Sequence, residues 1–369
     1  MTARNAFIYD FLLVEGGAEA LSLHVIDRFR EFELVAGFID GKQFPASALP
    51  QGRYRSLTSA TRKRGWQGLK TMAAFDHRGK FLVGYDTAVF SGVYAPVGVV
   101  HRGGDRNLYY CHTPPRFAYD LESHYQAEAL QWQRPLLRRL AAHVRRRYET
   151  AIRCMDRIAV NSENVARRLR DHLGVDHSEI IHPPVDTANY HWIDDEGYFL
   201  STARLEPYKR VDRLVDAFSQ MPGKKLVIAS GGSQETELRS RAAGLDNIRF
   251  TGWQSKAALR ELVGRCRATL YLPRDEDFGM SPVESMAAGK PVIGVAEGGL
   301  LETVADGRTG ILIPPANLET GESATEAIIN AVQVMSRETA RAMQAECEQR
   351  AQRFNVATFD EAFARFVAP

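Results

Sequence analysis

Cysteine is scarce in this chain of 369 residues, and long apolar runs are missing. The four cysteines, Cys111, Cys154, Cys266 and Cys347, are widely scattered, which argues against a disulfide framework or a zinc site. No run of about 18 apolar residues occurs, so no membrane-spanning helix is expected. The N-terminus lacks the ordered basic, apolar and cleavage segments of a signal peptide. These absences predict a cytoplasmic protein.

Several motifs are missing as well. The chain contains no G-x-G-x-x-G pattern, no P-loop, no internal repeat and no recognisable nucleic-acid-binding signature, so no nucleic-acid partner is expected. With 44% hydrophobic and 25% charged residues it has an ordinary globular composition, and its length favours two domains. The net charge is +2, but residues 1–190 carry +6 and the rest −4. The basic half favours an anionic partner or surface.

The most informative stretch covers residues 269–304. A short strand at residues 269–272 leads into an acidic loop, and a compact helix follows. Ser281, Pro282 and Glu284 predict the start of that helix: a hydroxyl N-cap, a proline at the first helical position and a capping-box glutamate.

A second strand and helix are expected directly afterwards. Residues 291–295 read as a buried strand, and Gly298 and Gly299 open another helix. Ligands bind at the carboxyl edge of open α/β sheets, and helix N-termini suit anions. Glu276 in the loop and Glu284 in the helix lie eight residues apart, so each can reach a different end of one ligand.

This stretch resembles the nucleotide-sugar site of the family-4 retaining glycosyltransferases, which have the GT-B fold. Their E-x7-E signature, with F-G-hydrophobic between the glutamates and A-x-G-x-P-V afterwards, is matched without a gap. Taken alone, Glu284 is explained as a helix cap, and Glu276 as part of a solvated acidic turn or a metal-binding D-x-D. The composite of more than a dozen positions favours the glycosyltransferase interpretation.

The resemblance implies a role for each of these positions. Glu276 would hold the sugar hydroxyls together with the backbone amides of four residues: Phe278, Gly279, Met280 and Ser281. Glu284 would hold the ribose. Arg204 and Lys209, which follow the strand at residues 197–201, resemble the pair that grips the donor's diphosphate. Two cations and a helix N-terminus would offset the charge that the diphosphate gains as the glycosidic bond breaks.

Glycine turns complete the expected donor site. Gly231 follows the strand at residues 226–230, and Trp253 lies in the family's base-binding loop, either near the nucleobase or packed in the core. Gly16 and Gly17 precede a helix expected to run to about Phe32, and the resemblance places them over the donor sugar.

His112 ends a predicted strand at residues 108–111, just before two prolines that keep the chain extended. A lone histidine is normally a satisfied structural residue. The phrase Y-C-H-T-P-P-R, however, resembles that of bacterial polysaccharide and O-antigen mannosyltransferases. It implies that His112 contacts the donor sugar and lines the acceptor path.

Two basic segments have open interpretations. Residues 51–80 interleave aromatic residues, Trp66 among them, with cations that include Arg53, Arg55, Arg62, Lys63, Arg64 and Lys70. They form either a contact with an anionic membrane or lipid diphosphate, or a solvated segment that packs Trp66 into the domain. Residues 136–158 read as an arginine-rich helix whose charged face lies on a membrane or in solvent.

The expected fold class is α/β, of the GT-B type: two Rossmann-like domains with parallel sheets facing an interdomain cleft, and a C-terminal helix that crosses back to the N-terminal domain. The predicted limits are 1–188 for the acceptor-binding domain, 189–352 for the nucleotide-sugar-binding domain and 353–369 for the crossing helix.

The activity implied is that of a retaining hexosyltransferase. Mannose from GDP-mannose is the favoured donor, and a glycan or lipid-linked oligosaccharide in polysaccharide or lipopolysaccharide biosynthesis is the acceptor. No metal or other cofactor is expected, and the basic half suits peripheral contact with the inner membrane face. UDP-glucose or another UDP-sugar stays open as donor. A UDP-sugar 2-epimerase and a non-catalytic sugar-nucleotide-binding protein are the alternatives.

Overall fold

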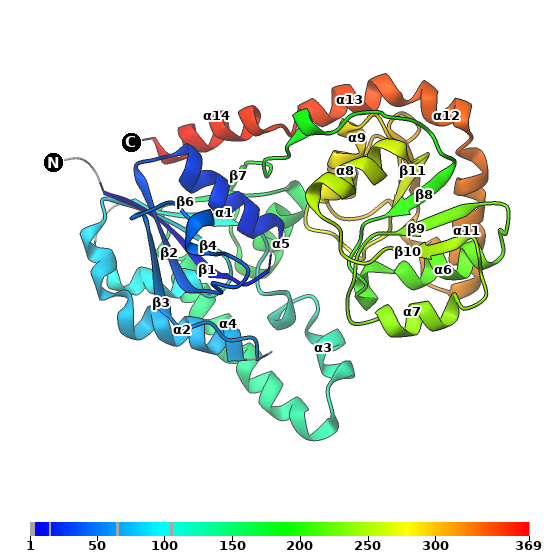
Figure 1. Ribbon diagram of the computed structural model, residues 1–369. Helices are drawn as coiled ribbons and strands as arrows, with labels where there is room; N and C mark the ends of the chain where they lie inside the picture. The colour runs from blue at the N-terminus through cyan, green and yellow to red at the C-terminus, as the bar shows by residue number, and fades with distance from the viewer. Residues whose placement is uncertain (1–3, 15, 64–65, 104–105, 369) are drawn as a thin grey trace. The chain divides into compact units, whose positions relative to one another are not determined.

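The computed structural model describes residues 4–14, 16–63, 66–103 and 106–368 (Figure 1). The chain divides into two compact units. Unit 1 comprises Met1–His182 and Asp360–Pro369, and unit 2 comprises Pro183–Phe359. Each unit has its own parallel sheet, as the sequence predicted. The predicted domain limits and the cleft between the domains stay predictions.

In the described part of unit 1, seven parallel strands lie in the order β3-β2-β1-β4-β5-β6-β7. They are β1 (Asn5–Leu12), β2 (Phe32–Ile39), β3 (Tyr54–Thr58), β4 (Thr87–Ser91), β5 (Asn107–Cys111), β6 (Arg157–Val160) and β7 (Glu179–Ile180). The central strands β4 and β5 are buried along their whole length, because helices cover both faces of the sheet.

Figure 1 shows α1 on one face of this sheet and α2 and α4 on the other. The helices of unit 1 are α1 (Gly17–Arg28), α2 (Trp66–Arg78), α3 (Glu122–Glu128), α4 (Arg134–Ile152), α5 (Glu163–Leu173) and the C-terminal part of α14 (Val356–Val367). In α14, Phe363 is fully buried and contacts the ring of Phe29 at 5.1 Å. Asp360 also lies 2.6 Å from His24 of α1, so this helix is part of the core of unit 1.

In unit 2, six parallel strands lie in the order β10-β9-β8-β11-β12-β13 within the described residues. They are β8 (Tyr198–Ser201), β9 (Lys225–Ile228), β10 (Ile248–Phe250), β11 (Ala268–Tyr271), β12 (Val292–Val295) and β13 (Gly310–Ile313). The helices are α6 (Val211–Ser219), α7 (Glu235–Arg241), α8 (Lys256–Arg265), α9 (Met280–Ala287), α10 (Leu300–Thr303), α11 (Gly321–Val334), α12 (Arg337–Ala342) and α13 (Gln344–Gln352). A continuous apolar core joins the sheet to these helices.

Two helix limits differ from the prediction. α1 ends at Arg28, because Phe32 begins β2 and pairs with Asn5 of β1. α4 ends at Ile152, because Arg157 already belongs to β6 and pairs with β5. In both places the pairing of a buried strand overrides the helical spacing of apolar residues.

No helix among the described residues is long and apolar enough to cross a membrane. All four cysteines are free thiols, which confirms that they form no disulfide framework.

Candidate active site

Lys209 and Glu276 form an ion pair beyond the carboxyl ends of β8 and β11. Lys209 ends the 3-10 helix η7 (Pro207–Lys209), and its side chain is only 8% exposed. Its Nζ donates to Oε2 of Glu276 at 2.5 Å and lies 3.4 Å from the Tyr271 hydroxyl. Because Glu276 is paired with a buried cation, its interpretation as part of a solvated acidic turn is wrong.

The electrostatics of this pair keep the lysine charged. Burial alone would lower the pKa of Lys209, but the nearby Tyr271 and Glu276 and the hydrogen bond to Glu276 raise it well above its usual value. A permanently charged ammonium at this edge is suited to an anionic ligand.

Arg210, the residue directly after Lys209, constrains the path of the backbone in this loop. Arg210 has a left-handed backbone, with φ of 53°, which costs a non-glycine residue about 1–2 kcal/mol. Its buried guanidinium donates to Oε1 of Glu297 at 2.7 Å. This ion pair ties the loop after β8 to the loop after β12.

The acidic loop packs directly on the Gly298–Gly299 turn. The amide of Gly299 donates to the carbonyl oxygen of Glu276 at 2.8 Å. A Cβ atom on Gly299 would lie 2.4 Å from Cα of Phe278, and one on Gly298 would lie 2.5 Å from the Glu276 carbonyl oxygen. The two glycines therefore permit a close backbone approach. The helix that follows them, α10, is a single turn of four residues rather than a second anion-binding helix.

The start of α9 was predicted wrongly. The helix begins at Met280, and Gly279, with φ of 91°, is its N-cap. Ser281 is therefore inside the first turn, and no side chain caps the helix. The left-handed backbone of Gly279 and the buried ring of Phe278 set the helix start, whereas Pro282 is tolerated anywhere in the first turn.

Glu284 is partly buried within α9 and does not act as a capping-box residue. The Tyr190 hydroxyl is close enough to the Glu284 carboxylate to influence its pKa. Burial raises the pKa of Glu284, while the Tyr190 hydroxyl and the charge of Arg260 oppose the shift. Arg260 in turn pairs with Asp186 at 2.7 Å.

Of the remaining predicted residues of unit 2, Arg204 and Trp253 are exposed, whereas Gly231 is buried. Arg204 is exposed in the loop after β8. Trp253 is 65% exposed, so its interpretation as a packed core residue is wrong. A Cβ atom on Gly231 would lie 2.6 Å from Nε1 of Trp253, so this glycine leaves room for the indole.

In unit 1, Gly16, Gly17 and His112 lie at the carboxyl ends of β1 and β5. Gly16 is the N-cap of α1, and Gly17 is its first residue. The ring of His112 meets those of Tyr9 and Tyr110 edge-on, with centroids 6.2 and 5.2 Å apart. The Tyr9 hydroxyl donates to Glu19 of α1 at 3.2 Å, which links the glycine turn to the surroundings of His112.

Asp10, at the end of β1, is a buried carboxylate that the sequence did not reveal. It accepts hydrogen bonds from three consecutive backbone amides, those of Val93, Tyr94 and Ala95, at 2.6–2.7 Å. Burial raises its pKa to about 6, although the three amides oppose the shift. Gly92, with φ of 97°, is needed there, because a Cβ atom would lie 2.5 Å from the Asp10 carboxylate carbon.

The sequence pattern also did not reveal Tyr190 and Arg260, because they are distant from Glu284 in the chain and come near it only in the folded structure. Among the described residues, no group of three or more His, Cys, Asp or Glu side chains is placed to hold a metal ion. The expectation of metal-independent chemistry stays a prediction.

Two family models match adjacent parts of the chain. The model described as "Glycosyltransferase Family 4" matches residues 47–189, and that described as "Glycosyl transferases group 1" matches residues 186–348. The second match includes every predicted site residue of unit 2.

Curated relatives match part of the chain. Alpha-1,3/1,6-mannosyltransferase ALG2 from Dictyostelium discoideum is 36% identical over 147 residues, which cover 33% of this chain and 35% of that protein. D-inositol 3-phosphate glycosyltransferase from Mycobacteroides abscessus is 30% identical over 186 residues, 44% of this chain and 42% of that protein. The matched part is thus less than half the length of each relative.

A solved structure extends the similarity to the whole fold. Anabaena HepE in complex with UDP and glucose has a TM-score of 0.74 and 18% identity, and 98% of each chain is covered. Together with the two parallel sheets, this similarity confirms the predicted GT-B fold class.

Proposed function

We propose that this chain is a retaining hexosyltransferase, because residues 47–189 match the family model described as "Glycosyltransferase Family 4" and residues 186–348 match that described as "Glycosyl transferases group 1". It moves a hexose from a nucleoside-diphosphate sugar to a hydroxyl of a glycan or lipid-linked oligosaccharide, in polysaccharide or lipopolysaccharide biosynthesis. It works in the cytoplasm, in peripheral contact with the inner membrane face.

The buried ion pair between Lys209 and Glu276 is the observation that carries this proposal. A departing nucleoside diphosphate gains negative charge, which a fixed ammonium offsets best where water is excluded. In this proposal Lys209 and the exposed Arg204 hold the diphosphate. Glu276 and the first amides of α9 hold the sugar hydroxyls, and Glu284, beside Tyr190, holds the ribose.

Retention follows a front-face course in this proposal. The two glutamates do not act as the acid and nucleophile of a glycosidase. Glu276 is already paired with Lys209, and Glu284 is partly buried within α9 beside Tyr190, so neither is proposed as an attacking group. The departing diphosphate takes the proton of the incoming hydroxyl, and no metal is required. His112 lines the acceptor path in unit 1.

GDP-mannose is the proposed donor, supported by the similarity to the mannosyltransferase ALG2. The complex of HepE with UDP and glucose makes a UDP-sugar the second candidate. Thermal unfolding with GDP, UDP, GDP-mannose and UDP-glucose, without added metal, distinguishes the two. A donor at a hundredfold excess over its Kd stabilises the folded protein by about 2.7 kcal/mol. A shift with the GDP species alone supports mannose, and a shift with the UDP species alone replaces it.

A matched pair of variants tests the site itself. Arg204→Gln removes an exposed cation beside η7, and Arg249→Gln removes an exposed cation on the edge strand β10. We expect both variants to melt like the wild type without ligand, and only Arg204→Gln to lose the nucleotide-induced shift. Equal shifts in both would remove Arg204 from the donor site.

Turnover separates the transferase from its alternatives. Consumption of the donor that depends on an added acceptor supports transfer, and NMR of the new anomeric centre tests retention. Epimerised donor formed without acceptor would indicate a 2-epimerase, and binding without turnover a non-catalytic protein. A covalent glycosyl-enzyme that accumulates in Glu276→Gln or Glu276→Ala would overturn the front-face course.

A further inference from the structure

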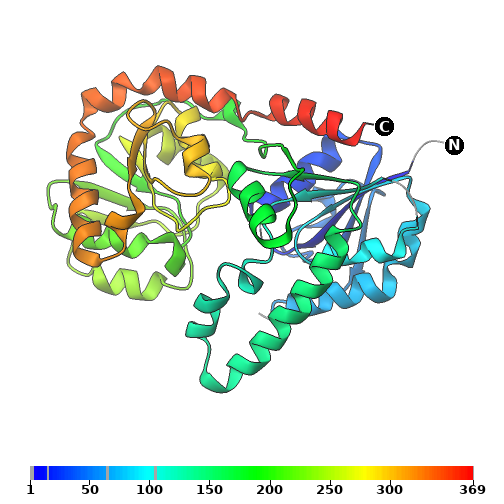
Figure 2. The same ribbon diagram turned by 180° about the vertical axis from the view of Figure 1, so that it is seen from behind.

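The connection between α3 and α4 exposes a cluster of large apolar side chains. Figure 2 shows these two helices extending away from the sheet of unit 1. Between them lies the 3-10 helix η5 (Gln131–Gln133), and around it Leu130, Trp132 and Leu136 are 60%, 73% and 66% exposed. We call residues 130–136 the tip. A contiguous exposed apolar surface of this kind marks an interaction site.

Arginines follow the tip along α4. Arg138, Arg139 and Arg146 are exposed, whereas the neighbouring Arg145 and Arg147 are used in ion pairs within unit 1. An exposed tryptophan and leucines, followed on the same helix by exposed arginines, form the pattern of a segment that enters an anionic lipid interface.

The other basic segment of unit 1 lacks this arrangement. Arg53 donates to three backbone carbonyl oxygens, and Lys70 donates to another at 2.7 Å. Arg62 pairs with the carboxylate of Asp40 at 2.6 Å. Arg53 and Lys70 thus stabilise the fold, whereas the exposed Arg55, Arg62 and Lys63 lie on β3 or before α2 and not along one helix.

Trp66, in this second basic segment, is nevertheless exposed. It is 64% exposed at the start of α2, so the interpretation that packs it into the domain is wrong. Arg64 lies outside the described residues.

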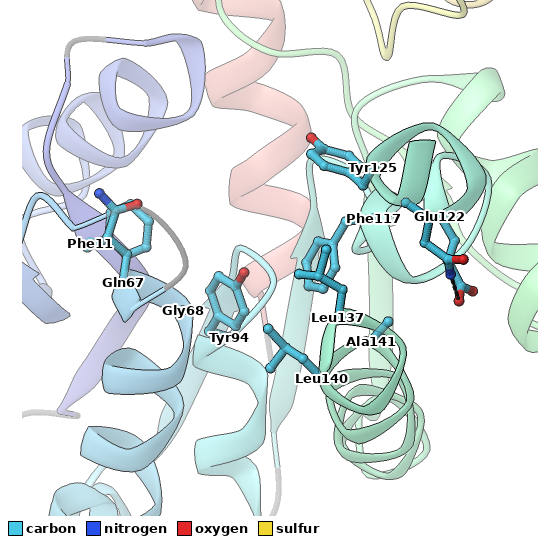
Figure 3. A pocket seen from close by; sticks show the side chains of 11 residues that line it. Phe11, Gln67, Gly68, Tyr94, Phe117, Glu122, Tyr125, Leu137, Leu140 and Ala141 are labelled. Atoms are coloured by element: carbon cyan, nitrogen blue, oxygen red, sulfur yellow. Dashed lines mark hydrogen bonds between the residues drawn. The ribbon is translucent and has the colours of Figure 1, made fainter. Parts of the chain in front are cut away.

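A cavity of about 290 Å³ opens between α2, α3 and α4, next to the tip (Figure 3). Most of its wall is aromatic or aliphatic, and its apolar side chains include Phe11, Tyr94, Phe117, Tyr125, Leu137 and Leu140. Two of these, Leu137 and Leu140, follow the tip directly on α4. The volume is close to that of the smallest ligand cavities.

The polar side chains that α3 contributes to this wall are already hydrogen-bonded. Glu122 accepts from Arg145 and from Gln126, both at 2.8 Å. Gln126 in turn accepts from Arg138 at 3.0 Å. The other polar groups of the wall are Gln67 and the hydroxyls of Tyr94 and Tyr125, so the wall offers an apolar chain more contact than it offers a sugar hydrogen-bond partners.

We propose that the tip docks on an anionic lipid leaflet and that the adjoining cavity takes an acyl or prenyl chain of a lipid. The inference rests on the proposed function only in taking a lipid-linked acceptor as the reason for docking. Lipid binding is measured without donor or acceptor, so failure of docking and failure of transfer are distinguishable.

Vesicle flotation tests the tip. Wild-type protein is expected to float with vesicles of phosphatidylglycerol and phosphatidylcholine, and at least tenfold less with phosphatidylcholine alone. The variant Leu130→Ser/Trp132→Ser/Leu136→Ser is expected to lose at least tenfold in vesicle affinity. Val334→Ser, at an equally exposed position (61%) in unit 2, is expected to bind like the wild type. Wild-type protein that stays unbound, or a triple variant that binds normally, would overturn docking.

Tryptophan fluorescence with brominated phosphatidylglycerol locates the contact. Wild-type emission is expected to be quenched, and Trp132→Phe, which keeps an apolar ring, is expected to bind but lose most of the quenching. Undiminished quenching in Trp132→Phe would place the contact elsewhere. Since Trp132 is 73% exposed, neither replacement at this position disturbs the core.

Calorimetric titration with monomeric dodecyl phosphate tests the cavity. Ala141 lies in its wall and is 3% exposed, whereas the adjacent Ala142 is exposed. We expect Ala141→Phe to lower the affinity at least tenfold and Ala142→Phe to leave it unchanged. Leu140→Phe is a second cavity-filling variant, to be used where Ala141→Phe unfolds. No binding by the wild type, or equal binding by a folded cavity-filling variant, would overturn the cavity assignment.

Discussion

Removal of Lys209 should destabilise unit 2 far more than removal of an exposed lysine would. In Lys209→Met the carboxylate of Glu276, whose side chain is 17% exposed, loses the cation 2.5 Å away. Loss of one partner of a buried ion pair costs about 3–5 kcal/mol. Because Glu276 is not fully buried, we expect the lower end, about 3 kcal/mol. For a unit of this size that lowers the melting temperature by roughly 6–12 °C.

Calorimetry without ligand measures this effect, and a double variant tests its cause. Lys209→Met/Glu276→Gln removes both charges, so it should recover at least half of the lost stability. Lys209→Met, Glu276→Gln and the double variant should all lose the nucleotide-induced shift if the pair also binds the donor. Recovery of stability without recovery of binding therefore separates the two roles of the pair.

An exposed ion pair provides the matched control. Arg265 lies 2.6 Å from Glu261 on α8, with both side chains at least one third exposed. Arg265→Met should cost less than about 1 kcal/mol. The reasoning fails if Lys209→Met lowers the melting temperature by no more than Arg265→Met does, or if the double variant shows the sum of the two single effects.

Three further predictions follow from the close contacts and the buried carboxylate. Gly299→Ala should push the Phe278 backbone away and weaken donor binding at least tenfold in a titration, whereas Gly223→Ala, with nothing within 4 Å of the new atom, should bind normally. Gly92→Ala should destabilise unit 1 by more than about 2 kcal/mol in urea unfolding, because it combines a clash with a left-handed backbone. Because burial raises the pKa of Asp10 to about 6, the folded state holds this proton more tightly, and the unfolding free energy should fall by roughly 2 kcal/mol between pH 4 and 6. Asp10→Asn should remove that fall, and an identical pH dependence in both proteins would contradict the assignment.

The strands that carry the site were predictable from the sequence, because each is a short apolar run followed by a glycine or a charged turn. β11 and β12 lie where the spacing of residues 269–304 placed them. The start of α9 was not predictable from Ser281 and Pro282. A capping signal fixes the helix start only to within a turn, and the burial of Phe278 selects the register.

The partners of the predicted residues could not be read from the sequence. Tyr190 lies far from Glu284 in the chain, and no local pattern shows that its hydroxyl comes close to that carboxylate. Asp10 looks like any aspartate at a strand end, and only the fold of Gly92 and the following amides reveals its burial. Such contacts depend on tertiary structure, which spacing alone does not encode.

The tie between Arg210 and Glu297 has a consequence for how this protein can diverge. It braces the segments after β8 and β12 against each other, so a change in either one is transmitted to the other. Trp253 is not part of this ion pair. Its side chain is exposed and lies against Gly231, which has no side chain of its own. Replacement of Trp253 should therefore cost little folding stability. Changes in the segments after β8 and β12 have to occur together, because the ion pair joins them. The family resemblance implies that Trp253 lies near the nucleobase, so under the proposed function position 253 is where variants with an altered base preference should first be sought.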